Sequence, residues 1–238
     1  VAISAVFQPK TTCGRGYSVV DFVCKESYDL RDFIALIDYL RSPKGCPWDR
    51  EQTHASIRKN FIEETYEALE AIDNGDLALL REELGDVLLQ VIFHSIIGDE
   101  DGAFGFNDVT DRCARKMLSR HTHIFGDAHA ENASEALGNW EAAKLKEKGF
   151  SGLREDLDDI PRVFPALMRA GKAAKKIRKA GGVYECREQV KNTAAQMDLS
   201  SEEAVGEALY EICRIAEQNG VDAELALKRR TDKVIEKN

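Results

Sequence analysis

The sequence predicts an all-α protein built of helical hairpins. Its 238 residues include only 17 glycines and 5 prolines, a low number for a turn-rich all-β protein. Apolar residues recur at the three-, four- and seven-residue spacing of one helix face, and no segment shows the strict alternation of a strand. The length suffices for one large domain or two small ones.

The first half of the chain contains the two helices that matter most for function. We expect them over residues 53–72 and 77–97, joined by the turn Asp73-Asn74-Gly75-Asp76, whose last residue can cap the second helix. A helix over residues 29–41 precedes them and ends at the prolines and glycine of residues 42–47. Because one turn separates the pair, the two helices should lie antiparallel.

Capping signals place the remaining helices. Asn107 can cap a helix that ends at Arg120, and Asn132, with Glu135 three residues later, can cap one that ends at Lys148. We expect loops between these helices. In the second half, Pro161 suits the first turn of a helix that reaches Ala180, and Ser200 with Glu203 forms a capping box; the last three helices are expected over residues 183–197, 201–218 and 222–236.

Charge and cysteine content exclude several classes of partner. Asp and Glu number 42 against 33 Lys and Arg, so the formal net charge is −9. Nucleic acids and anionic membranes attract basic surfaces, so we expect neither as a partner. The most apolar stretch, residues 87–97, is too short to span a bilayer. The six scattered cysteines include no Cys-x-x-Cys pair, which favours reduced thiols in a cytoplasmic protein over disulfides or a zinc site.

Five carboxylates are clustered on the two central helices. Glu63, Glu64 and Glu67 project from one side of the first helix, and Glu83 and Asp86 are one turn apart on the second. In an antiparallel pair, both groups lie at nearly the same height above the connecting turn. Clustered carboxylates repel one another unless a cation joins them, and oxygen ligands without histidine or cysteine favour Mg²⁺ or Mn²⁺.

Two other interpretations of the carboxylates are open at this point. The helices can turn these acids into solvent, as they do with most acidic residues; the neighbouring Leu84 and Val87 instead favour a face near the core. A di-iron carboxylate bundle needs Glu-x-x-His on two helices, and the chain offers this spacing once, from Glu51 to His54. We expect His54, His94, His121 and His123 to be structural or polar-loop residues.

Taken in order, the acidic motifs and their flanks resemble the MazG family of nucleoside triphosphate pyrophosphohydrolases. The family pattern is a helical Glu-Glu-x-x-Glu followed by Glu-x-x-Asp, which stand here at residues 63–67 and 83–86. The resemblance covers about residues 28–150. The flanking motifs are Gly-Cys-Pro-Trp-Asp at residues 45–49, Gln-Thr-His at residues 52–54, a basic helix end at residues 116–121 and Asn-Trp-Glu at residues 139–141.

The resemblance implies an α-helical homodimer with a four-helix-bundle type of core. It also implies Mg²⁺-dependent hydrolysis of NTPs and dNTPs to the monophosphate and pyrophosphate, with Mn²⁺ as a possible substitute. By motif match, the expected metal ligands are Glu64, Glu67, Glu83 and Asp86. Glu63 and Glu64 are the expected catalytic residues, with Glu63 either a further ligand or the base that acts on water.

The resemblance also implies a set of nucleotide-binding residues. Lys116 and Arg120, one turn apart, would hold phosphates. Trp140 would contact or stack on the nucleotide, Lys144 would assist, and Asn60 is a weaker contact candidate. Without the resemblance, Lys116 and Arg120 read as ordinary cations at a helix C-terminus, Lys144 as a solvated charge and Trp140 as a core residue.

The expected domains are a tail or linker over residues 1–27, a MazG-like catalytic domain over residues 28–150 and a degenerate MazG-like helical domain over residues 151–238. The last domain resembles the first at an offset near 121, with Ala204-Val205-Gly206-Glu207 in place of residues 83–86. Gln189, Asn192 and Ala204 replace three of the five acids there. We therefore expect the second half to be structural or regulatory.

Two alternative functions stay open. One is a narrower all-α enzyme of the dimeric dUTPase or phosphoribosyl-ATP type, which a substrate panel would distinguish. The other is a catalytically decayed helical dimer that acts as an interaction or regulatory module and binds no Mg²⁺. The survival of all five acids in the first half favours an enzyme, because a structural role does not explain clustered like charge.

Overall fold

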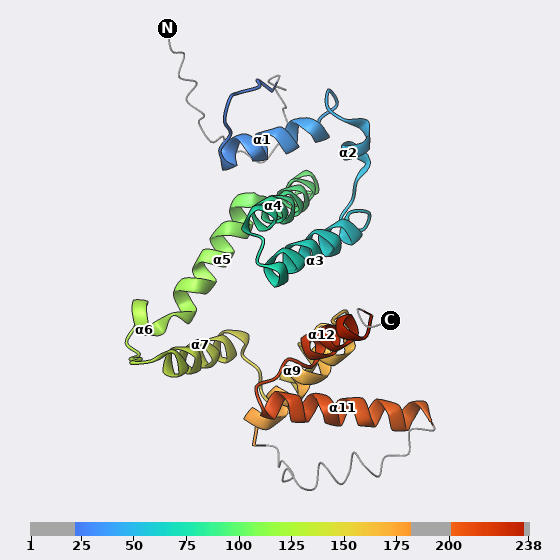
Figure 1. Cartoon of the computed structure of the whole chain (residues 1–238). Helices are drawn as coiled ribbons and strands as arrows, with labels where there is room; N and C mark the ends of the chain where they lie inside the picture. Colours follow the sequence, from blue (N-terminus) through green and yellow to red (C-terminus); the bar gives the residue numbers. More distant parts are fainter. Residues whose placement is uncertain (1–21, 182–200, 236–238) are drawn as a thin grey trace. The chain divides into compact units, whose positions relative to one another are not determined.

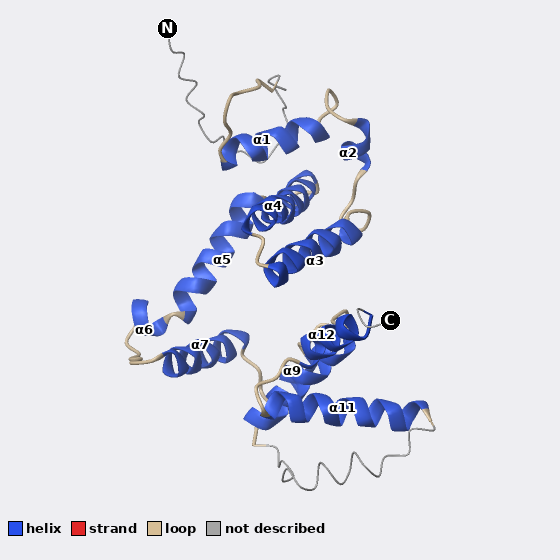
Figure 2. Ribbon diagram, viewed as in Figure 1, coloured by secondary structure: helices blue, strands red, loops and turns tan. Residues whose placement is uncertain are grey.

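The computed structural model describes residues 22–181 and 201–235, and all regular structure in these ranges is helical (Figures 1 and 2). This confirms the predicted all-α class. The elements are α1 (Leu30–Arg41), α2 (Pro47–Glu51), α3 (Arg58–Asn74), α4 (Leu77–Glu100), α5 (Phe106–Arg120), α6 (Thr122–Phe125), α7 (Ala133–Lys148), α8 (Leu153–Asp158), α9 (Ala166–Lys179), α11 (Glu202–Gln218) and α12 (Ala223–Ile235).

The chain divides into two compact units, Val1–Ser119 and Arg120–Asn238. The first contains α1–α4 and most of α5, and the second contains the remaining helices. This division falls before residue 150, where the sequence places the end of the catalytic domain. The domain boundaries at residues 27 and 150 stay a prediction.

Helices α3 and α4 form a tight antiparallel hairpin, and the two helices lie side by side in Figure 1. Gly75 ends α3 in the left-handed conformation with φ of 67°, which a residue without a Cβ adopts at little cost. The Asp76 side chain accepts hydrogen bonds from the backbone N–H groups of Ala78 and Leu79, each at 3.0 Å, and so caps α4. The predicted Asp76 cap is confirmed, but the turn is shorter than predicted, because α3 continues through Asn74.

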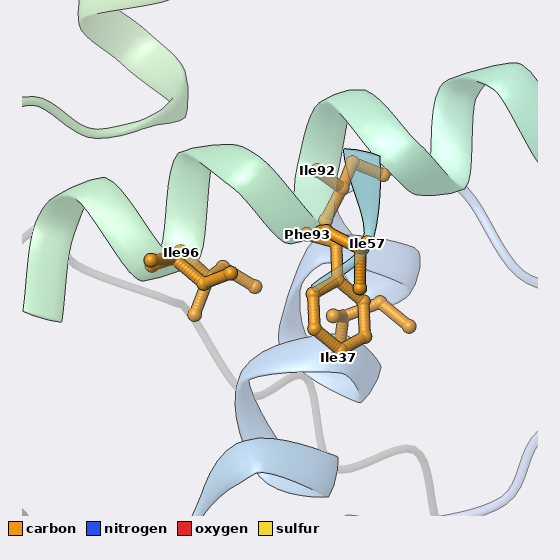
Figure 3. Packing of buried hydrophobic residues seen from close by; sticks show 6 residues of the cluster. Ile37, Ile57, Ile92, Phe93 and Ile96 are labelled. Atoms are coloured by element: carbon orange, nitrogen blue, oxygen red, sulfur yellow. The ribbon is translucent and has the colours of Figure 1, made fainter. Parts of the chain in front are cut away.

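A small apolar core holds α1 against the second half of α4. Its buried members are Ile37 from α1, Ile57 from the turn before α3, and residues of α4 (Figure 3). Full burial of one such side chain contributes about 1.5–3 kcal/mol. Since Ile57 directly precedes α3, this core also fixes where that helix begins. The complete buried cluster is Ile37, Ile57, Ile92, Phe93, Ile96 and Ile97.

Arg41 connects three parts of the first unit. The residue is 6% exposed, and its guanidinium donates to both carboxylate oxygens of Glu100, at 3.0 and 2.6 Å. It also donates to the backbone carbonyls of Asp49 and Gln52, at 2.5 and 3.1 Å. The last residue of α1 is thereby tied to the last residue of α4 and to the segment that leads into α3.

In the second unit, α9 packs against α11, and α12 contacts both. Ala174 of α9 and Cys213 of α11 are each 1% exposed, so small side chains allow the close approach of the two helices. Arg178 of α9 donates to both carboxylate oxygens of Glu217 on α11, at 2.8 and 2.6 Å. The predicted helix over residues 183–197 lies outside the described residues.

The helix boundaries differ from the prediction where local hydrogen bonds compete. Residues 53–56 form a turn in which Thr53 and Ser56 exchange side-chain and backbone hydrogen bonds, so α3 begins at Arg58. Asp108 accepts from the Gly105 N–H at 2.8 Å, so Asn107 lies inside α5 and is not its cap. The short helix α6 lies where the sequence predicted a loop, and α2 and α8 lie in segments to which it assigned no helix.

The caps of the other helices are partly as predicted. Asn132 accepts from the Glu135 N–H at 3.0 Å and caps α7, as expected. The cap of α11 is Ser201, which accepts from the Ala204 N–H at 3.1 Å; Ser200, the cap that the sequence indicated, lies outside the described residues. Helix α9 begins at Ala166, behind Pro165, and not at Pro161.

The described cysteines, Cys24, Cys46, Cys113 and Cys213, are free thiols. Cys13 and Cys186 lie outside the described ranges. Within those ranges, no helix combines the length and the apolar character needed to cross a membrane.

The Arg41 contacts predict a large and specific loss of stability. We expect Arg41→Met to lower the free energy of unfolding by about 3 kcal/mol, because two carbonyls and the Glu100 carboxylate lose a buried charged partner. Chemical denaturation of the purified chain measures this change. The matched control is Arg115→Met, which removes the exposed ion pair with Asp111 and should cost less than about 0.5 kcal/mol. Equal effects of the two substitutions would contradict the role given to Arg41.

Candidate active site

The α3–α4 hairpin brings three carboxylates together. Glu64 projects from α3, and Glu83 and Asp86 project from α4; one oxygen of each lies within 4.8 Å of the others. We call these three residues the carboxylate trio. In the described part of the chain, they form the one group of three or more potential metal ligands that meet in this way.

Small residues at the helix contact make this arrangement possible. Ala68 and Ala71 of α3 are 7% and 0% exposed, so the backbones of α3 and α4 approach closely near the turn. Glu64 lies one turn before Ala68 and therefore shares its face toward α4. Glu83 is 8% exposed, and Glu64 and Asp86 are half-buried.

The electrostatics of the trio are unfavourable without a cation. Burial raises the pKa of Glu64, and the charges of Asp86, Glu67 and Glu63 raise it further. Burial likewise raises the pKa of Glu83, followed by the charges of Glu67 and Asp86. Each carboxylate thus makes its neighbours harder to ionise.

The other two predicted acids stand outside the trio. Glu67 is exposed, but its charge acts on both Glu64 and Glu83, so it lies beside them. Glu63 is exposed and forms an ion pair of 2.7 Å with Lys59, one turn earlier on α3. The structure therefore brings together three of the four predicted ligands, with Glu67 adjacent, and leaves Glu63 in a surface ion pair.

The donor set fits a hard divalent cation. All three groups supply carboxylate oxygen, which Mg²⁺ and Mn²⁺ prefer, and no histidine or cysteine takes part in the trio. The three oxygens, which lie within 4.8 Å of one another, could share one such ion after side-chain rotamer changes.

Two of the predicted nucleotide-binding residues lie in the same unit as the trio. Asn60 is half-buried on α3, one turn before Glu64, and so lies on the same side of that helix. Lys116 is half-buried on α5, and its backbone carbonyl accepts from the Ser119 hydroxyl at 3.2 Å.

The other three predicted nucleotide-binding residues meet in the second unit. The Arg120 guanidinium lies 5.1 Å from the centre of the Trp140 ring, and the Lys144 ammonium lies 5.7 Å from it. Arg120 is 7% exposed, and its Nε donates to Glu147 at 2.9 Å. Burial, followed by the charges of Lys148, Lys176 and Arg120, lowers the pKa of Lys144. The result is a cationic cluster built on one tryptophan.

A histidine pair belongs to the features that sequence reasoning missed. Nδ1 of His54 and Nδ1 of His94 lie 2.7 Å apart, and the two rings are stacked. The residues are 40 positions apart, so no local spacing could indicate this contact. The Arg120–Glu147 pair, 27 positions apart, is also a nonlocal contact. Trp140 and Lys144, by contrast, lie four residues apart on one helix face, and this spacing alone indicates that their side chains meet.

The second half presents only part of the predicted repeat. Ala204 and Glu207 lie on α11 at the positions that correspond to Glu83 and Asp86. Glu188, Gln189 and Asn192, the other members of the repeat, fall outside the described residues.

Comparison with known proteins identifies the family. Residues 52–125, which contain the trio, match the family model described as the MazG nucleotide pyrophosphohydrolase domain. The chain is 40% identical over 215 residues to the nucleoside triphosphate pyrophosphohydrolase of Escherichia coli strain K12. This alignment covers 84% of this chain and 82% of that protein.

Two further relatives extend this result. The nucleoside triphosphate pyrophosphohydrolase/pyrophosphatase MazG of Thermotoga maritima is 37% identical over 87% of this chain and 82% of its own. The nucleoside triphosphate pyrophosphohydrolase of Mycolicibacterium smegmatis is 35% identical over 87% of this chain and 63% of its own. On this likeness, which spans most of the sequence, the chain belongs to the MazG family of nucleotide pyrophosphohydrolases.

Proposed function

We propose that this chain is a Mg²⁺-dependent nucleoside triphosphate pyrophosphohydrolase, which converts NTPs and dNTPs to monophosphates and pyrophosphate. The observation that carries the proposal is the carboxylate trio, in which like charges are held together although they repel one another. The relatives of this chain that were compared above are named for the same activity. Mn²⁺ is a possible substitute for Mg²⁺.

Each acid has a proposed role. Glu64, Glu83 and Asp86 would hold the metal, and Glu67 would join them as a fourth ligand. When bound, Mg²⁺ would neutralise phosphate charge and increase the acidity of a coordinated water. Glu63, or Glu64 from its place in the trio, would accept the proton of the attacking water.

The basic residues would position the triphosphate. Lys116 and Arg120 would supply positive charge and hydrogen-bond donors to phosphate oxygens. Because Glu147 engages Nε of Arg120, we assign the phosphate contact to the terminal nitrogens of its guanidinium. Trp140 and Lys144 would contact the nucleotide beside Arg120, and Asn60 is a further contact candidate on α3.

A homodimer is also part of the proposal. The α3–α4 hairpin exposes a row of large apolar side chains, and monomeric proteins rarely leave such a patch in water. A second copy that covers this patch would turn the two-helix hairpin into a four-helix bundle. The exposed residues are Ile62, Tyr66, Leu69, Ile72, Leu77 and Leu84.

We further propose that residues 151–238 serve a structural or regulatory role, and that the protein works in the cytoplasm on nucleotides and on neither nucleic-acid polymers nor membranes. The free thiols of Cys24, Cys46, Cys113 and Cys213 support a reducing compartment. The excess of acidic residues supports the exclusion of anionic polymers and surfaces.

The first prediction from this proposal concerns activity. Wild-type protein should release pyrophosphate from one or more NTPs or dNTPs only when Mg²⁺ is present. Glu64→Gln should lower this rate at least about 100-fold, because a metal site contributes several kcal/mol of charge stabilisation. The control is Glu70→Gln, which neutralises an exposed acid of the same helix and should keep the wild-type rate. Equal and zero pyrophosphate release by wild type and Glu64→Gln, across the whole panel, would overturn the proposal.

The second prediction concerns pH and stability without metal. Glu64 and Glu83 have folded-state pKa values above their ordinary 4.5, so the folded state favours their protonated forms. In chelator, the contribution of the trio to the free energy of unfolding should therefore fall as pH rises above about 4.5, and level off above the raised pKa values.

Thermal melting of wild type and Asp86→Asn in chelator, across this pH range, isolates that contribution. The variant should melt higher than wild type near pH 7, by an amount that shrinks toward pH 4.5, because Asp86 no longer repels its neighbours. Added Mg²⁺ should stabilise wild type and not the variant. A variant that melts lower than wild type at every pH would contradict this account.

The third prediction concerns assembly. Wild type should have the mass of two chains in sedimentation or light scattering. Tyr66→Lys should shift it toward the mass of one chain, because a charge would have to be buried in the new interface. Val163→Lys alters an apolar residue that is 75% exposed in the second unit and should leave the mass unchanged. A dimer that withstands Tyr66→Lys together with Leu69→Glu would place the interface elsewhere.

A further inference from the structure

The first unit contains a cavity of about 430 Å³ that none of the proposed roles uses. This volume lies within the range of small-ligand sites, about 300–1,000 Å³. Aromatic rings dominate its walls: Phe61 from α3, His94 from α4, and His54 and Phe104 from the segments that flank these helices. The remaining lining residues are Arg58, Val91, Ser95 and Val109.

The rings form walls suited to a flat ligand. His54 and Phe104 are nearly parallel, with centres 6.2 Å apart, and Phe61 is tilted against His94 at 5.7 Å. Gly98 permits this arrangement, because a Cβ at that position would lie 2.7 Å from the Phe104 carbonyl oxygen and 2.8 Å from its ring. The glycine thus allows the Phe104 ring to close one side of the cavity.

The histidine pair adds a hydrogen-bonding edge. A contact of 2.7 Å between two Nδ1 atoms holds one proton, so one ring donates from Nδ1 and the other accepts. The donor ring then has a lone pair at Nε2, and the acceptor ring has an N–H at Nε2. When the shared proton passes to the other ring, the Nε2 that carried a proton loses it and the other Nε2 gains one. The donor and the acceptor at the two Nε2 positions thereby exchange places.

The cavity lies next to the carboxylate trio along the hairpin. Phe61 is one turn before Glu64 on α3, about 4.5 Å along the axis. On α4, Asp86, Gln90 and His94 follow at four-residue intervals and so lie along one side of the helix. Gln90 is 7% exposed, and its Oε1 accepts no hydrogen bond from any described residue. A buried acceptor without a donor therefore stands between the trio and the histidine pair.

We propose that this cavity binds the nucleobase of the substrate whose phosphates the trio engages through its metal. The aromatic rings would cover the face of the base, and the two Nε2 atoms of His54 and His94 would read its edge. This inference rests on the proposed function, and it adds the position of the base and the means of its recognition.

The histidine pair also indicates broad base acceptance. Keto bases such as uracil and guanine present an N–H beside a carbonyl, and amino bases such as adenine and cytosine present a ring nitrogen beside an amino group. A pair that can exchange its donor and acceptor suits both kinds of edge. Burial and the charge of His54 lower the pKa of His94, which favours the neutral form of that ring.

The test uses the full chain without metal, so that binding is separate from catalysis. AMP, GMP, CMP, UMP and dTMP are titrated singly while the imidazole NMR signals of His54 and His94 are followed. Both signals should shift saturably with keto and amino nucleotides, and inorganic tripolyphosphate should leave them unmoved. The exposed His129 is the internal control.

A kinetic arm uses His54→Asn, at an exposed position, with His129→Asn as the matched control. His54→Asn should raise KM for ATP and UTP about tenfold while kcat changes less than about twofold, as expected for one lost recognition contact. If NTPs are hydrolysed but no nucleotide moves the two histidine signals, the base pocket is wrong and the proposed function stands. If no NTP is hydrolysed, the proposed function fails first.

Discussion

The arrangement of this protein depends on the close antiparallel contact of α3 and α4, which holds three carboxylates together against their mutual repulsion. Ala68 and Ala71 bring the two helices close, and the left-handed Gly75 with the Asp76 cap fixes their register. Burial and like charge then raise the pKa of both Glu64 and Glu83. The hairpin therefore stores an unfavourable interaction that a divalent cation would turn into a favourable one.

The rest of the first unit supports this hairpin at its open end. The isoleucine core fixes α1 and the entry to α3 against α4, and Arg41 ties three chain segments at the same end. The aromatic cavity is lined from the same stretch of α4 as this core, and Gln90, whose side-chain oxygen has no partner among the described residues, precedes it on the helix. In our proposals, one helical hairpin thus places a metal, a phosphate chain and a base in sequence along its length, with a second copy covering its outer apolar face.

The sequence predicted what local spacing determines. The Asp76 cap, the short connection between α3 and α4, and the meeting of Glu64 with Glu83 and Asp86 all follow from helix periodicity and turn signals. The Lys59–Glu63 ion pair has the i,i+4 spacing that favours such contacts on a helix, so local spacing could have indicated it. The His54–His94 contact depends on how distant segments fold together and leaves no trace in local spacing. Helix boundaries were mispredicted where turn hydrogen bonds or prolines compete with the helix, as before α3 and α9.

The central claim is that the carboxylate trio is a metal site, and direct titration tests it without reference to any substrate. Metal-free wild-type protein, titrated with Mn²⁺ and followed by calorimetry or by the electron paramagnetic resonance of the free ion, should take up the ion saturably at each chain. The variants Glu83→Gln and Asp86→Asn should each lose that uptake, while Glu70→Gln keeps it. Uptake by both trio variants that equals that of wild type would contradict the account.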